Sequence, residues 1–290
     1  TNDMIRQTIR EKIKNVARDA SIYYSSIGLR QPNTQIRTRD DGAKRYMLHL
    51  TNGKNFYRNR TLESGIGQIN IAAQVMGWDI SYFLGTSKNA ISHELFHACV
   101  NGYEIKMGTT PEERRAYSGY NEGMATVMGH TFDHDGVISA RENHGDHVYT
   151  MILSQPLGVC VPPEAAYTND DFFAYFARKS AGNSMRYLAG TGVDEDDDKN
   201  GVLEQTRKYL LADTELLPYG SPYESYLYAY RMGLHRALKM QFDTSAADAY
   251  WDFAKNRAYE NDAYSPMRTG DTATRWELRT NRFDGSAIYQ

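Results

Sequence analysis

The chain has 290 residues, of which 41% are hydrophobic and 24% charged, and its formal net charge is −3. This composition is ordinary for a soluble globular protein, and the length suits one large domain or two small ones. No apolar run approaches the about 18 residues that a membrane-spanning helix requires. No basic motif with interleaved aromatic residues indicates nucleic-acid binding either, so we expect neither a membrane span nor a nucleic-acid partner.

The first part of the chain is predicted to contain one helix followed by strands. Apolar residues at helical spacing mark an amphipathic first helix: Ile5, Ile9, Ile13 and Val16. Residues 45–50 alternate in polarity, and a turn sequence at 51–54 separates them from an extended stretch at 55–58. This pattern predicts a β-hairpin. Residues 65–76 predict a further strand.

The next predicted element is a helix that carries the string His93-Glu94-Leu95-Phe96-His97. Histidines four residues apart project from one helical face, so two imidazoles can share one Zn²⁺. The intervening Glu94 lies near that metal and can accept a proton from zinc-bound water. The residues around the motif are mostly apolar, which is typical of a buried helix, and Asn101-Gly102 supplies a helix stop.

A catalytic zinc site also needs a third protein ligand and an open fourth position. Glu122 is the candidate: 24 residues separate it from His97, and it stands in the string Asn121-Glu122-Gly123-Met124-Ala125-Thr126. The apolar residues after it predict a second helix that starts near Glu122. We expect an extra loop, about residues 106–117, between the two helices.

The two strings in this order resemble the gluzincin zinc metallopeptidases, and the second string closely resembles one found in the M1 aminopeptidase family. The resemblance implies that His93, His97 and Glu122 are zinc ligands and that Glu94 is the general base. It also implies that the predicted strand at 65–76 is the edge strand that binds the substrate backbone. The likeness is divergent, because the gap between the strings is longer than in that family. The chain also lacks a Gly-Ala-Met-Glu-Asn string, which puts aminopeptidase activity in doubt.

Residues 131–142 resemble an EF-hand calcium loop, with Asp133, Asp135 and Glu142 as candidate calcium ligands, although Thr131 replaces the usual first Asp. A weaker loop of this kind begins at Asp196, but Arg207 stands where the bidentate acid belongs. Acidic solvated turns are the alternative in both places. Four histidines cluster soon after Glu122, and we expect surface or capping roles for them in preference to a second metal site: His130, His134, His144 and His147.

The rest of the chain is predicted to be mainly helical, over 171–180, 202–211, 223–240 and 246–254. Tyr230-Arg231-Met232-Gly233 resembles the M1 segment in which a Tyr stabilises the oxyanion of the tetrahedral intermediate. That resemblance assigns Tyr230 to catalysis. Tyr228 and His235 are the alternatives, and a purely structural role in the core or at its rim is another.

Cysteine content and composition say little about where the protein acts. Cys99 and Cys160 are the two cysteines, and we expect Cys99 to behave as a buried small hydrophobe. A disulfide between them is the alternative. Because proteolysis is safest outside the parent cell, we expect a secreted or cell-surface protein.

Together these patterns predict an α+β, zincin-like fold with a small N-terminal mixed sheet, an active-site helix and a mainly helical C-terminal part. Residues 1–105 would form the sheet-bearing subdomain, and 106–290 the helical one that carries the third zinc ligand. The predicted function is a zinc-dependent metallopeptidase with one catalytic Zn²⁺, a peptide or protein substrate and Glu94 as the base. One alternative is a zinc hydrolase specialised for glycosylated or cell-wall peptides, or a toxin domain with a single target. The other is a catalytically silent calcium- or ligand-binding module.

Overall fold

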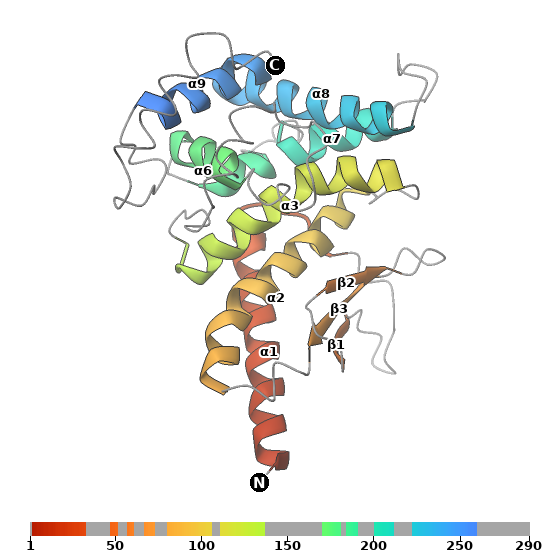
Figure 1. Cartoon of the computed structure of the whole chain (residues 1–290), viewed down its shortest axis with the longest axis vertical. Helices are drawn as coiled ribbons and strands as arrows, with labels where there is room; N and C mark the ends of the chain where they lie inside the picture. The colour runs from red at the N-terminus through yellow and green to blue at the C-terminus, as the bar shows by residue number, and fades with distance from the viewer. Residues whose placement is uncertain are drawn as a thin grey trace. The chain divides into compact units, whose positions relative to one another are not determined.

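The structure, a computed structural model, describes residues 2–32, 47–51, 57–60, 67–72, 80–105, 111–136, 170–180, 184–190, 200–211 and 222–259. The described α-helices are α1 (Asn2–Ser26), α2 (Ile80–Gly102), α3 (Pro111–Asp133), α6 (Asp170–Lys179), α7 (Val202–Leu211), α8 (Pro222–Phe242) and α9 (Ala246–Tyr259). A 3-10 helix, η3 (Met185–Leu188), and the strands β1 (Met47–Thr51), β2 (Tyr57–Arg60) and β3 (Gly67–Ala72) complete the described elements (Figure 1).

Contacts between residues divide the chain into two units. The first consists of Thr1–Glu104 with Met128–Val137, and the second of Ile105–Val127 with Ile138–Gln290. Helix α3 is uninterrupted, so it starts in the second unit and ends in the first. The sequence prediction divides the chain once, between residues 105 and 106, and does not anticipate that the end of α3 returns to the first unit.

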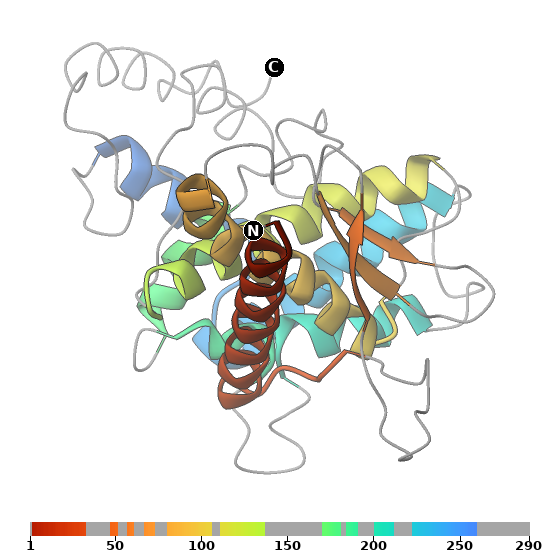
Figure 2. The same ribbon diagram turned by 90° about the horizontal axis from the view of Figure 1, so that it is seen from below.

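In the first unit, α1 lies alongside α2 (Figures 1 and 2). The buried face of α1 is apolar and repeats at helical spacing: Ile9, Ile13, Val16, Ala20 and Tyr24. The Tyr24 hydroxyl donates a hydrogen bond of 2.7 Å to the carbonyl of Ser92, the residue before the His93–His97 motif. The predicted first helix is confirmed, and it fixes α2 at the start of that motif.

The three strands of the first unit form one small sheet in the order β1-β3-β2. Strand β1 is parallel to β3 in a register that pairs Met47 with Gln68, and β2 is antiparallel to β3 in a register that pairs Arg60 with Gly67. The sheet contacts α2 through β2 and β3. The motif helix therefore contacts both a helix and a sheet within one unit.

The second unit has an aromatic core. Phe172 and Phe173 of α6 are buried, and their rings contact Phe253 of α9 at 5.5 Å and Tyr120 of α3 at 6.0 Å between centroids. Helices α7 and α8 pack closely. The predicted helices at 171–180, 202–211, 223–240 and 246–254 are confirmed as α6, α7, α8 and α9.

The predicted α+β class is wrong, because helices dominate the described residues and a sheet does not organise them. The described strands have only four to six residues, whereas α1, α2 and α3 have 23 to 25 each. Short alternating stretches in the sequence carry too few residues to outweigh long apolar stripes at helical spacing.

The predicted hairpin between residues 45–50 and 55–58 is also wrong. Strand β3 lies between β1 and β2, so these two strands pair with β3 and not with each other. The Tyr-Arg-Asn-Arg strand β2 occupies an edge of the sheet, as is usual for charged strands. Because β3 is paired on both sides, it cannot be the edge strand that the resemblance implied.

The predicted start of the second helix and the loop before it need correction too. Helix α3 begins at Pro111, so Glu122 lies in its middle and most of the predicted loop at 106–117 is helical. Proline is favoured in the first turn of a helix. The loop was expected because the gap between the two strings is long, but the first half of α3 occupies much of that gap instead.

Candidate metal centre

Helix α2 presents the motif histidines on one face while its other faces are buried. Around the motif, Ile91, Leu95, Phe96, Ala98, Cys99 and Val100 are all buried. His97 is 5% exposed, and His93 and Glu94 are half-buried. Between Ile91 and Val100, the polar residues are therefore Ser92 and the three motif residues His93, Glu94 and His97.

The two imidazoles converge on one point. The Nε2 atoms of His93 and His97 are 3.2 Å apart, and the rings lie at 80° to each other. Two nitrogen ligands of a tetrahedral zinc, each about 2.0–2.1 Å from the metal, are separated by about 3.3 Å. The pair thus fits a shared zinc. The same distance allows one ring N–H to donate to the other nitrogen, and zinc would replace that proton.

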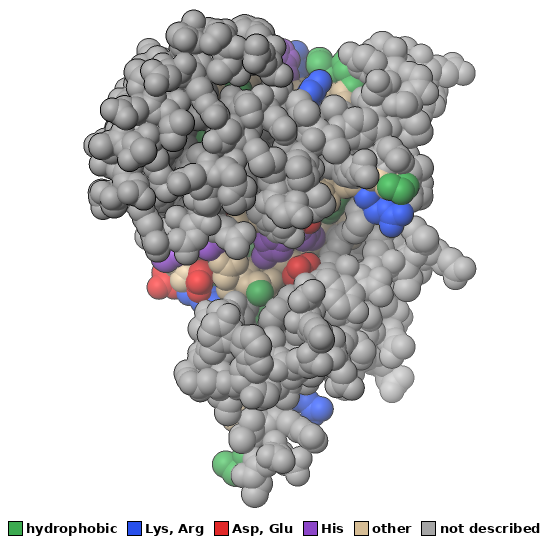
Figure 3. All heavy atoms as spheres, viewed as in Figure 1, with side chains coloured by type: hydrophobic (Ala, Val, Ile, Leu, Met, Phe, Trp, Pro, Cys, Tyr) green, Lys and Arg blue, Asp and Glu red, His purple; other side chains and the backbone are tan. Residues whose placement is uncertain are grey.

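Glu122 offers a third candidate ligand atom. One side-chain ligand atom from each of His93, His97 and Glu122 lies within 4.8 Å of the other two. Glu122 is half-buried, so its carboxylate is not sealed in the core. Among the coloured atoms of the space-filling view, histidine and acidic side chains come to the surface next to each other (Figure 3). Two nitrogens and one carboxylate oxygen are a donor set that zinc accepts, with a fourth position left for water or substrate.

The cysteine on α2 takes no part in this group. Cys99 is fully buried and its thiol is free, which confirms the expectation of a small buried hydrophobe. Burial raises the pKa of the Cys99 thiol far above its usual range. Cys99 is not among the described residues whose ligand atoms converge, so it is not a candidate ligand. Cys160 lies outside the described residues.

Tyr230, the residue assigned to the oxyanion by resemblance, is fully buried in α8. Its hydroxyl accepts a hydrogen bond of 3.3 Å from Nδ2 of Asn121, the residue before Glu122, and its ring stacks on Tyr120 at 4.9 Å. Asn121 also donates to the carbonyl of Tyr117 at 3.1 Å. These contacts fix the phenol against α3, and its catalytic role stays a prediction.

The two alternatives to Tyr230 have structural contacts of their own. Tyr228 is half-buried, and its ring meets Tyr209 edge-on with centroids 6.5 Å apart. His235 accepts a hydrogen bond of 3.4 Å through Nδ1 from the backbone N–H of Ala246, the first residue of α9. His235 therefore caps the start of a helix, where backbone N–H groups lack partners within the helix.

The candidate calcium loop begins inside a helix. Thr131 and Asp133 belong to the last turn of α3, and the Asp135 carboxylate forms an ion pair of 2.8 Å with Lys88. The hydrogen bond from Lys88 lowers the pKa of Asp135, and the charge of Lys88 adds to this effect. Calcium would have to displace that lysine from Asp135. Glu142 lies outside the described residues, so the calcium site stays a prediction.

The histidines after Glu122 do not join the candidate centre in the described part of the chain. His130 lies in the last turn of α3, a favourable place for a basic group beside the negative end of the helix dipole. His134 is exposed just after that helix, and His144 and His147 lie outside the described residues.

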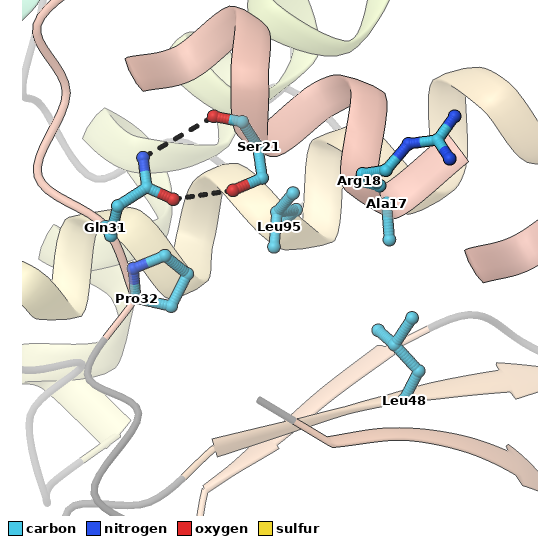
Figure 4. A pocket seen from close by; sticks show the side chains of 7 residues that line it. All are labelled: Ala17, Arg18, Ser21, Gln31, Pro32, Leu48 and Leu95. Atoms are coloured by element: carbon cyan, nitrogen blue, oxygen red, sulfur yellow. Dashed lines mark hydrogen bonds between the residues drawn. The ribbon is translucent and has the colours of Figure 1, made fainter. Parts of the chain in front are cut away.

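A hollow of about 370 Å³ lies on another face of α2, within the first unit. Leu95, in the middle of the motif, lines it together with Leu48 of β1, and Ser21 and Gln31 hydrogen-bond to each other at its rim (Figure 4). Leu95 is two residues from each histidine, and so it points away from the face that they share. This hollow is therefore separate from the candidate metal centre.

Comparison of the chain with protein-family models, with curated proteins and with solved structures found no match. The gluzincin resemblance therefore rests on the residues of the two strings alone.

Proposed function

We propose that the protein is a zinc metallopeptidase of the gluzincin type. The observation that carries the proposal is the convergence of His93, His97 and Glu122, whose ligand atoms lie within 4.8 Å of one another. The order His-Glu-x-x-His followed by a downstream Glu supports it, because this set pairs a three-ligand site with an adjacent carboxylate base. Among the described helices, none is long and apolar enough to cross a membrane.

In this proposal His93, His97 and Glu122 hold the metal, and Glu94 moves protons. Zinc in such a site acts as a Lewis acid and makes water a better nucleophile near neutral pH. The Glu94 carboxylate accepts the proton of the attacking water and then gives it to the leaving amine. Glu94 follows His93 directly in α2 and is half-buried, so this residue is not sealed in the core.

A digest of a defined peptide library tests the proposed reaction. Zinc-loaded protein should produce new peptide termini that mass spectrometry detects, and a chelator that removes zinc should abolish them. The protein in which Glu94 is replaced by Gln, purified in the same way, controls for a contaminating protease. Equal cleavage by both proteins would contradict the proposal, and the absence of cleavage by zinc-loaded protein would favour the silent binding module.

The assignment of Tyr230 makes a separate prediction. We expect Tyr230→Phe to lower kcat by about 10²–10³-fold with KM nearly unchanged, as for the loss of a donor that acts only in the transition state. The matched control is Tyr120→Phe, because Tyr120 is buried beside Tyr230 and its hydroxyl has no hydrogen-bond partner among the described residues.

Steady-state kinetics of the two variants would decide whether Tyr230 acts in catalysis. An unchanged kcat in Tyr230→Phe would leave this tyrosine a packing residue. A loss of kcat in Tyr228→Phe alone would assign the oxyanion-stabilising role to Tyr228 in place of Tyr230.

A further inference from the structure

Asn121 is a fully buried amide of α3 whose nitrogen and oxygen have different surroundings. Its Nδ2 donates to the carbonyl oxygen of Tyr117 at 3.1 Å and to the hydroxyl oxygen of Tyr230 at 3.3 Å. Its Oδ1 is buried and has no hydrogen-bond partner in the described part of the chain. Asn121, Tyr117 and Tyr230 all belong to the second unit, so both hydrogen bonds lie within a single unit.

The carbonyl of Tyr117 determines which way the amide faces. A carbonyl oxygen can only accept a hydrogen bond, so the nitrogen of the Asn121 side chain, and not its oxygen, must face it. The same nitrogen also faces the hydroxyl of Tyr230. Because an amide nitrogen only donates, the Tyr230 oxygen is the acceptor in this pair, and the hydroxyl proton of Tyr230 points away from Asn121.

Burial strengthens this hydrogen bond and also makes the amide unfavourable for stability. Asn121 and Tyr230 are both fully buried, so water does not compete for the phenol oxygen. The unpartnered Oδ1 of Asn121 lowers stability, and an apolar side chain of similar size would avoid that loss. Packing alone therefore favours an apolar residue at position 121, whereas the hydrogen bond to Tyr230 requires the amide.

A hydrogen bond donated to a phenol oxygen changes the chemistry of the phenol. It stabilises negative charge on that oxygen, so the O–H group becomes more acidic and a stronger donor. It also removes one of the directions in which the hydroxyl proton could point. A phenol that donates to an oxyanion benefits from both effects, because the donor is then aligned before the charge develops.

We propose that Asn121 is a positioning residue that orients and polarises the Tyr230 hydroxyl for donation to the oxyanion. This inference rests on the proposed function and on the role assigned there to Tyr230. Asn121 directly precedes Glu122 on α3, so adjacent residues of one helix carry the partner of the oxyanion donor and a candidate metal ligand.

The test is a double-mutant cycle between residues 121 and 230, with kcat and KM measured on the zinc-loaded full chain. Leucine at position 121 keeps the approximate size of the side chain but cannot donate a hydrogen bond. We expect Asn121→Leu to lower kcat about 10-fold with KM nearly unchanged, a smaller loss than in Tyr230→Phe because the phenol remains. In the Tyr230→Phe background, Asn121→Leu should cause no further loss, since the hydroxyl through which it acts is absent.

The matched background for this cycle is Tyr120→Phe, which removes the hydroxyl of the buried tyrosine that stacks on Tyr230. In that background Asn121→Leu should lower kcat by the same factor as in the unmodified protein. The melting temperature of Asn121→Leu should be unchanged or higher, because the unpartnered buried oxygen is removed. Asn121→Ala, a second variant without a donor, should give the same cycle.

A spectroscopic measurement on the metal-free protein tests the hydrogen bond independently of activity. In protein isotopically labelled at the Cζ atom of tyrosine, the NMR signal that is missing from Tyr230→Phe identifies Tyr230. We expect this signal to move in Asn121→Leu, because Cζ carries the oxygen that accepts the hydrogen bond.

The outcomes separate this inference from the proposed function. An unchanged kcat in Asn121→Leu, an equal loss of kcat in the Tyr230→Phe background, or an unchanged Cζ signal would overturn the positioning role and leave the zinc site standing. Loss of zinc in both Asn121 variants would also overturn it, since Asn121 would then act on metal binding. Zinc-loaded unmodified protein that cleaves no peptide would instead contradict the proposed function, and this inference would fall with it.

Discussion

Glu94→Gln is expected to abolish most peptidase activity while zinc stays bound. Glutamine has nearly the same size as glutamate but cannot accept the proton of the attacking water. Loss of a general base costs about 10²–10⁴-fold in rate, and misorientation of the water adds to this. Because Glu94 is not one of the three converging residues, zinc content should remain close to one ion per chain. The measurements are kcat/KM on a peptide identified by the library digest and metal content by elemental analysis.

The matched control for this variant is Glu104→Gln. Glu104 is an exposed acid two residues beyond the end of α2, and its replacement should leave activity unchanged. Activity of the Glu94→Gln protein within a few-fold of the unmodified protein would remove Glu94 from the mechanism. A loss of activity together with zinc would show instead that Glu94 acts in metal binding.

Removal of any one ligand should have the second largest effect. His93→Ala, His97→Ala and Glu122→Ala each leave two protein ligands, so the loss in zinc affinity should exceed the 10- to 100-fold typical of residues outside the ligand set. Each variant should purify with little zinc. Zinc that binds only the folded state raises the melting temperature, and this rise should disappear in all three variants.

Substitution of a histidine outside the group provides the control for these variants. His134→Ala changes an exposed histidine that follows α3, and it should keep both the zinc and the thermal shift. Near-full zinc occupancy in Glu122→Ala would exclude Glu122 from the site and would require a different third ligand. Loss of zinc in His134→Ala would point to a different set of histidines.

The two candidate histidine ligands could be predicted from sequence because their spacing is set by helix geometry. Two histidines four residues apart share a face of any α-helix, so His93 and His97 needed only a helical segment around them. Glu122 needed more, because a string of six residues suggested it but only the fold brings its carboxylate to the imidazoles. That convergence depends on the course of α3, which the sequence did not reveal.

The strand order and the helix spacing could not be predicted in this way. The turn sequence at 51–54 favours a hairpin locally, but pairing with β3, a strand from later in the chain, separates β1 from β2. The close approach of α3 to α2 at Gly129 was not predicted, because a glycine within a helical pattern is ordinary until its distance from Asn89 is known. The Asn121–Tyr230 hydrogen bond links residues 109 positions apart, so no local sequence pattern predicts it.

X-ray absorption at the zinc edge of protein purified without added metal tests the zinc site most directly. We expect close to one zinc per chain, with nitrogen and oxygen ligands at about 2.0–2.1 Å and outer-shell scattering from two imidazoles. The outer-shell signal should fall to one imidazole in any zinc that His93→Ala retains. A protein without zinc, sulfur ligands, or a spectrum that His93→Ala and His97→Ala leave unchanged would contradict the assignment of this centre.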